Sequence, residues 1–141
     1  LTENLALRGK ASQSTRYEHA FGGPDSANDG NNIAIFSYGS CTHTAEQEEP
    51  WWTVDLLDSY IITSITITNR EDCCRNRLSG MRIHIGDSAK KNGRQNEICA
   101  VISDIPAGNS VGFACDGMDG RYVNIVLPDR EEFLTLCEVE V

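Results

Sequence analysis

The pattern of apolar and polar positions predicts a protein built from short β-strands. Residues 61–68 are β-branched at seven of eight positions, and Ile65 and Ile67 alternate with polar neighbours, as in a strand with one buried face. No stretch keeps the 3.6-residue apolar period of an amphipathic helix. Further strands are predicted at residues 51–56, 81–85, 121–127 and 134–141.

Turn-rich segments separate these predicted strands, at residues 22–25, 108–109 and 116–117. Short strands divided by such turns indicate an all-β fold, an antiparallel β-sandwich, rather than a parallel α/β sheet. Residues 18–50 are the exception, because they form a long polar segment rich in Gly and Asn. Long loops on a rigid sandwich usually carry function, so a binding site is expected there.

Length and charge narrow the possibilities. The 141 residues have the size of one compact domain, so a single domain over residues 1–141 is expected. No apolar run approaches the roughly 20 residues that a membrane helix needs, which predicts a soluble protein. The formal net charge of −9 counts against nucleic acid or a membrane surface as partner.

Six cysteines form an even set without a repeated C-x-x-C pair, which favours disulfides over a zinc site. Disulfides indicate an oxidising compartment, so a secreted, extracellular protein whose signal peptide has been removed is expected. The sequence alone allows 15 pairings of six cysteines. The adjacent Cys73 and Cys74 either form a strained bridge, whose sulfurs would make a small apolar platform, or belong to two ordinary bridges.

The common signatures of enzymes are missing from the chain. It contains no H-E-x-x-H, no P-loop, no G-x-G-x-x-G and no G-x-S-x-G. Cysteines that are all able to pair are also poor candidates for a catalytic thiolate. We therefore expect a binding protein rather than an enzyme.

Residues 69–78 concentrate three arginines in an otherwise acidic chain. Arg70 and Arg77 lie at opposite ends of this short loop, so their guanidinium groups can converge on the oxygens of a carboxylate, a phosphate or a sugar. Asp72 can hold one guanidinium in place, and Arg75 is expected to form surface ion pairs.

A second polar cluster, at residues 25–31, places several side-chain oxygens around Gly30 and suggests calcium. It is not an EF-hand, because Phe36 stands where that loop requires Glu. Ligands from elsewhere in the chain would be needed. Taken alone, the cluster is typical of an Asx-turn with solvated carboxylates.

The spacing of His43, Arg70, Asp72 and Arg77 gives the pattern H-x26-R-x-D-x4-R, with Cys73 and Cys74 inside it. In this pattern the chain resembles the F-type lectins, or fucolectins, over nearly its whole length. The resemblance is supported by residues 3–6, 8–11, 39–43, 50–56 and 136–141. Relatives often carry Gly where this chain has Glu71, which adds a negative charge near the site.

The resemblance implies an antiparallel β jelly roll that binds terminal α-L-fucose without altering it. It implies that His43, Arg70 and Arg77 hydrogen-bond the axial 4-hydroxyl, the ring oxygen and the 3-hydroxyl side. A disulfide between Cys73 and Cys74 would stack against the ring. The methyl group would lie against His19 and Phe36.

A structural calcium ion is also implied by the resemblance. Its ligands would be the backbone carbonyls of Ser26, Asn31 and Cys137 and the side chains of Asp29, Ser40 and Glu138. The implied disulfides are Cys41 with Cys137, Cys73 with Cys74, and Cys99 with Cys115.

The resulting expectation is a calcium-stabilised lectin for fucosylated glycans, acting in innate immune recognition or agglutination and able to form trimers as relatives do. The alternatives are a discoidin-like adhesion module that binds protein or lipid, and a binding module cut from a glycosidase or a tandem lectin. Trp51, Trp52 and Tyr122 are expected to pack rather than to bind sugar. His84 shares a strand face with Arg82 and is expected to be solvated.

Overall fold

The computed structural model describes residues 4–16, 22–30, 33–34, 39, 41–72, 75–88, 95–128 and 131–141, and for residues 75 and 76 it describes the backbone alone. Within these residues the regular structure consists of strands and short 3₁₀ turns. The strands are β1 (Lys10–Gln13), β2 (Gln47–Glu48), β3 (Trp51–Thr68), β4 (Arg82–Gly86), β5 (Glu97–Val101), β6 (Ser110–Val126), β7 (Glu131–Glu132) and β8 (Glu138–Glu140). The 3₁₀ turns are η1 (Leu5–Arg8), η2 (Pro24–Ala27) and η4 (Arg75–Leu78).

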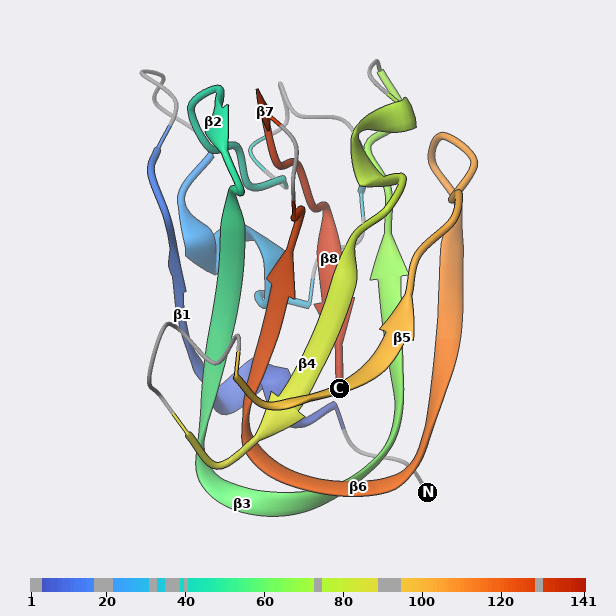
Figure 1. Cartoon of the computed structure of the whole chain (residues 1–141). Helices are drawn as coiled ribbons and strands as arrows, with labels where there is room; N and C mark the ends of the chain where they lie inside the picture. Colours follow the sequence, from blue (N-terminus) through green and yellow to red (C-terminus); the bar gives the residue numbers. More distant parts are fainter. Residues whose placement is uncertain are drawn as a thin grey trace.

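The fold is the antiparallel β-sandwich of the jelly-roll type that the sequence predicts (Figure 1). The main sheet runs in the order β1-β3-β6-β4-β5, β8 pairs with β3, and every named strand pair is antiparallel. The long strands β3 and β6 belong to both layers. The early part of β3 pairs with β1, its late part pairs with β8, and β6 accompanies it throughout.

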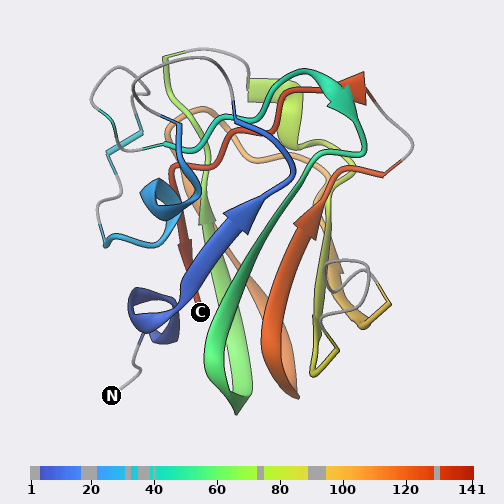
Figure 2. The same ribbon diagram turned by 90° about the vertical axis from the view of Figure 1, so that its left-hand side faces the viewer.

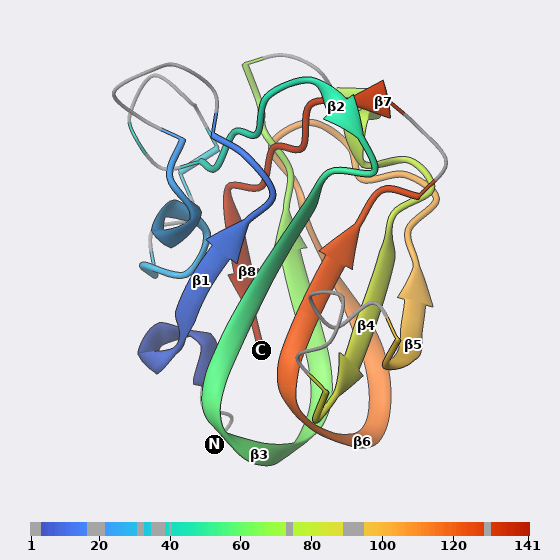
Figure 3. The ribbon, with the colours of Figure 1, turned by 60° about the vertical axis from the view of Figure 1, so that its left-hand side comes forward.

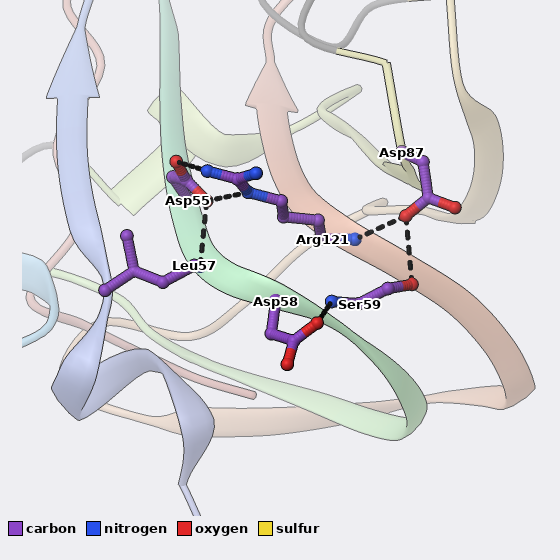
Figure 4. Close-up of polar contacts among 6 residues, drawn as sticks. All are labelled: Asp55, Leu57, Asp58, Ser59, Asp87 and Arg121. Carbon is purple, nitrogen blue, oxygen red and sulfur yellow. Dashed lines mark hydrogen bonds and ion pairs between the residues drawn. The ribbon is translucent and has the colours of Figure 1, made fainter.

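The bend of β3 lies at the end of the sandwich where β3 and β6 curve from one layer to the other (Figure 4). The pairing of β3 with β6 shifts register between Asp55 and Tyr60, and Leu57 has a φ of 69°. The Asp55 carboxylate accepts a hydrogen bond from the Leu57 backbone N–H at 2.8 Å and binds Arg121 through Nε at 2.7 Å. Asp55 therefore holds the bend of β3 against β6.

Long strands account for the main differences from the predicted elements. Residues 51–56 and 61–68 were expected as separate strands, but both belong to the single strand β3, because a bulge lets the chain bend without ending the ladder. The predicted strand 121–127 likewise falls in the longer β6, which ends at Val126. Of residues 134–141, only β8 is a strand.

The core lies between the two layers and is apolar. Trp52 is fully buried and donates its indole N–H to the Pro24 carbonyl at 3.0 Å, so it packs as expected. The prediction of a solvated His84 is wrong. His84 is 6% exposed, and its Nδ1 lies 2.8 Å from the carbonyl oxygen of Asn96, which directly precedes the neighbouring strand β5.

The two ends of the described chain lie together. The Leu5 N–H donates to the Val141 carbonyl at 2.9 Å, and the Val141 N–H donates to Asn4 Oδ1 at 3.0 Å. In Figure 1 this junction lies below β1 and β8, whereas β2, β7 and η4 occupy the opposite end of the sandwich.

Candidate functional site

The candidate site lies where η4 meets the β2–β7 ribbon (Figures 2 and 3). Backbone hydrogen bonds fix the segment that carries His43: its N–H donates to the Gly22 carbonyl at 3.0 Å, and the Thr44 N–H donates to the Leu134 carbonyl at 3.1 Å. These bonds bring together residues that are far apart in the sequence.

The His43 ring is buried, with 5% of the residue exposed. Its Nδ1 lies 2.8 Å from the Thr44 carbonyl oxygen. A carbonyl only accepts, so Nδ1 carries the proton in the neutral ring and Nε2 is the acceptor. Nε2 lies 3.4 Å from Nη1 of Arg77, which faces it as a donor. The site therefore contains one fixed acceptor beside a guanidinium donor.

Phe133 supports both of these side chains, and the sequence gave no indication of this role. The Arg77 guanidinium carbon lies 4.7 Å from the centre of the Phe133 ring, a cation–π contact. The ring also meets His43 edge-on, with ring centres 5.3 Å apart and planes at 70°. Phe133 is separated from His43 by 90 residues of chain, so local spacing could not have revealed it.

The surroundings of Arg77 shift its pKa in opposite directions. Burial lowers its pKa, and the neighbouring charge of Arg70 acts in the same sense, whereas Glu132 raises it. Glu132 Oε1 lies 3.8 Å from Arg77 Nε. Arginine remains charged in proteins, so Arg77 is a partly buried cation whose guanidinium N–H groups can donate hydrogen bonds.

Asp72 holds Arg70, as the sequence suggests. Its Oδ1 accepts from Arg70 Nε at 2.6 Å and its Oδ2 accepts from Arg70 Nη2 at 3.3 Å. The Arg70 side chain is only 12% exposed. A two-point contact of this kind fixes the plane of the guanidinium.

Gln13, at the end of β1, contacts the backbone of the segment that carries His43. Its Nε2 lies 2.7, 3.0 and 3.3 Å from the carbonyl oxygens of Thr15, Gly22 and His43, which share its two N–H donors. One amide thus links β1 to both segments that approach the site. Nothing in the sequence around Gln13 marks this role.

A second cluster surrounds Glu138, at the start of β8. Glu138 is fully buried, and its Oε2 accepts from the Gly30 N–H at 2.9 Å. Its Oε1 is buried without a hydrogen-bond partner in the structure described here. The pKa of Glu138 is raised to about 8: burial is the largest cause, the nearby Asp29 and Glu140 act in the same direction, and the Gly30 hydrogen bond opposes them.

Glu138 and Asp29 offer carboxylate oxygens of the kind that a calcium ion takes as ligands. A buried carboxylate oxygen that lacks a partner and lies beside the carboxylate of Asp29 is the arrangement that a hard cation with oxygen ligands would satisfy. Ser26, at η2, and Cys137 belong to the two segments that meet here. Among the described residues, no group of three or more His, Cys, Asp or Glu side chains is arranged to hold a metal.

Asn28 has a structural role that the sequence did not suggest. It is 7% exposed, and its Nδ2 donates to the carbonyls of Ala6 and Gly9 at 2.9 and 3.1 Å. This side chain ties η2 to η1. The segment is therefore more than a solvated Asx-turn.

Two of the three expected disulfides are confirmed, namely Cys41 with Cys137 and Cys99 with Cys115. Several predicted site residues lie outside the described residues: His19, Phe36, Cys73 and Cys74 of the sugar site, and Asn31 and Ser40 of the calcium site. In the part of the chain that the structure covers, no helix is long and apolar enough to cross a membrane.

Comparison with known proteins first defines the class. The family model of the NedA-like, galactose-binding domain matches residues 26–125. A fucose-binding module from Streptococcus pneumoniae, SpX-3, superimposes with a TM-score of 0.87 at 31% identity, over 99% of this chain and 97% of that module. The class is therefore that of galactose-binding-like sandwich domains.

Two further relatives define the family. Fucolectin-1 of the eel Anguilla japonica is 51% identical over 100% of this chain and 81% of its own length. A fucolectin from the serum of striped bass, Morone saxatilis, superimposes with a TM-score of 0.96 at 56% identity over 99% of this chain. The chain spans about half of that bass protein, 48% of its length. The chain belongs to the fucolectins, the F-type lectins, which are lectins and not enzymes.

Proposed function

We propose that the chain is a lectin that binds terminal α-L-fucose on glycans. The observation that carries this proposal is the arrangement of His43 and Arg77 on Phe133, with Arg70 fixed by Asp72. The relatives named fucolectins and the fucose-binding module support the choice of sugar.

The chemistry of the site suits this sugar. In the proposed complex, the axial 4-hydroxyl replaces Arg77 Nη1 as the donor to His43 Nε2, and the guanidinium groups of Arg70 and Arg77 donate to the ring oxygen and the 3-hydroxyl side. Hydrogen bonds to charged groups contribute about 1.5 to 3 kcal/mol each, and the ordering of sugar and protein offsets part of this. Affinity for the free monosaccharide should therefore be modest.

The apolar face of fucose needs an apolar wall. We assign it to His19 and Phe36 and to a bridge between Cys73 and Cys74, all of them outside the described residues. This assignment rests on the resemblance to the F-type lectins alone.

We also propose a structural calcium ion at the second cluster. The side chains of Asp29, Ser40 and Glu138 and the carbonyls of Ser26, Asn31 and Cys137 would hold it. A bound divalent cation supplies the positive charge that the buried Glu138 carboxylate otherwise lacks.

An extracellular location and a role in innate defence complete the proposal. The two disulfides support an oxidising compartment. Agglutination requires several sites in one assembly, since linking weak sites raises their combined affinity without new contacts. A homo-oligomer, such as a trimer, would supply these sites.

Titration calorimetry with methyl α-L-fucoside and methyl β-D-galactoside tests the sugar site. The protein should bind the fucoside in preference, and Arg77→Lys should weaken that binding about 10- to 100-fold, because a lysine cannot present two donors in one plane. The matched control is Arg82→Lys, an exposed arginine on β4. If Arg77→Lys binds like the parent while both variants remain folded, the site assignment is wrong.

Thermal unfolding with calcium and with EGTA tests the ion. At calcium well above its dissociation constant the melting temperature should rise by about 5 to 10 °C. Glu138→Gln should abolish this rise, whereas Glu140→Gln, two residues along β8, should keep it. An equal rise in parent and Glu138→Gln would remove Glu138 from the ligand set.

A further inference from the structure

The β2–β7 ribbon forms an acidic side of the sugar site. The two strands pair with Gln47 opposite Glu132 and Glu48 opposite Glu131. Glu132 reaches Arg77, with its Oε1 3.8 Å from Nε, so the ribbon adjoins the site directly. Glu46, which precedes β2, is close enough that its charge raises the pKa of Arg77.

Carboxylates already accompany the cations of the site. Arg70 binds Asp72 at two points, and Arg77 has Glu132 beside it. The ribbon adds further negative charge beside these two pairs of arginine and carboxylate.

Three carboxylates of the ribbon are exposed, namely Glu46, Glu48 and Glu131. Within the described part of the chain none of the three forms an ion pair. Like charges directly opposite in a strand pair destabilise it, so the pair of Glu48 and Glu131 does not favour folding of the ribbon. Their negative charge instead repels any anionic group of a ligand that approaches this side of the site.

We propose that Glu46, Glu48 and Glu131 exclude anionic sugars, so that the site selects neutral fucosylated glycans over sulfated or sialylated ones. This inference rests on the proposed binding of fucose and names the class of glycan that the site accepts. A fucose residue is uncharged and reaches Arg70 and Arg77 without penalty. A sulfate or carboxylate on the adjoining sugar must approach these three exposed carboxylates across water.

The expected size of the discrimination follows from Coulomb attraction and repulsion in water. Three like charges that each lay about 10 Å from the charge of the glycan would weaken its binding by about three- to tenfold at low salt. The effect should shrink at high salt, because the screening length falls to about 3 Å at 1 M ionic strength.

The experiment uses three probes with the same terminal sugar: methyl α-L-fucoside, the Lewis a trisaccharide, and Lewis a sulfated at the 3-position of its galactose. Affinities are measured by calorimetry at 20 mM and 500 mM NaCl. The test variant is Glu46→Gln/Glu48→Gln/Glu131→Gln. The matched control is Glu97→Gln/Asp116→Asn/Asp119→Asn, which removes the same charge from exposed positions on β5 and β6.

The parent should bind the sulfated trisaccharide about three- to tenfold more weakly than the neutral one at 20 mM NaCl, with little difference at 500 mM. The ribbon variant should lose this difference and keep its affinity for methyl α-L-fucoside, while the control should behave like the parent. Equal binding of both trisaccharides by the parent, or an unchanged difference in the ribbon variant, overturns the inference and leaves fucose binding standing. Failure of every protein to bind methyl α-L-fucoside overturns the proposed function, and the inference with it.

Discussion

Phe133 contacts both His43 and Arg77 of the candidate site. Its ring lies under the Arg77 guanidinium and against the edge of His43. A flat aromatic ring restricts the orientation of both neighbours, whereas an aliphatic side chain of similar volume would fill the space without attracting the cation.

Replacing Phe133 by Leu should therefore weaken binding of methyl α-L-fucoside about 3- to 30-fold, the equivalent of one cation–π contact. Phe133→Tyr keeps the ring and should stay within a few-fold of the parent. Calorimetry gives the affinities, and thermal unfolding separates them from stability. A Leu variant that binds like the parent would show that Phe133 only fills space.

At the scale of residues, the sequence singled out the polar side chains of the candidate site but not Phe133 and Gln13, which contact His43. The cluster of arginines in residues 69–78 pointed to Arg70 and Arg77, and His43 joined them through the resemblance to the F-type lectins. The structure brings His43 and Arg77 together, and the part that all three play in sugar binding stays a prediction. Phe133 and Gln13 look like ordinary strand and loop residues, and only the folded chain brings them to His43.

At the scale of elements, the bend of β3 is held by charge. Arg121 binds Asp55 through two nitrogens, at 2.7 and 2.9 Å, and its backbone N–H donates to Asp87. This pairing lowers the pKa of Asp55, with the Leu57 N–H and the charge of Lys10 acting in the same direction. Asp55 and Lys10 are register partners on β3 and β1, and the Asp55 carboxylate binds Arg121 on β6.

The pH dependence of stability should follow from Asp55. Its pKa is lower in the folded than in the unfolded chain, so its contribution is present above a pH of about 4 and is lost as the pH falls through the folded-state value. The melting temperature of Asp55→Asn should lie about 1 to 3 °C below that of the parent at pH 6, and the difference should vanish near pH 2. A difference that persists unchanged at pH 2 would mean that the ion pair is not its cause.

The strands could be predicted only where apolar and polar residues alternate along the chain. Residues 61–68 were identified from Ile and Thr alternation, but the link from Leu56 to Ile61 contains Leu57, Asp58 and Ser59, which resemble a turn. The structure keeps these residues in one bent strand because Asp55, Asp58 and Asp87 satisfy the polar groups of the bulge. Interactions of this kind depend on partners from other strands.

At the scale of the whole molecule, the two confirmed disulfides differ in the length of chain that they close. Cys41 and Cys137 are separated by 96 residues, and Cys99 and Cys115 by 16. In the chain-entropy model the first is worth about 4.7 kcal/mol and the second about 3 kcal/mol. The longer bridge also joins the segment before His43 to the strand that begins with Glu138.

Removing the longer bridge should therefore cost more. Cys41→Ala/Cys137→Ala should lower the melting temperature by about 15 °C, and Cys99→Ala/Cys115→Ala by about 10 °C. Only the first variant should also lose affinity for methyl α-L-fucoside. Equal losses of affinity in the two variants would show that the longer bridge has no particular link to the site.

The junction of residues 4 and 5 with Val141 sets how the lectin can be displayed. It lies away from the end of the sandwich that carries η4 and the β2–β7 ribbon (Figure 1). An anchor, a reporter domain or a second lectin attached at either end of this chain would leave the sugar site facing outward. Immobilised through a terminal tag, the protein should present its binding face to a glycan-coated surface rather than to its own support.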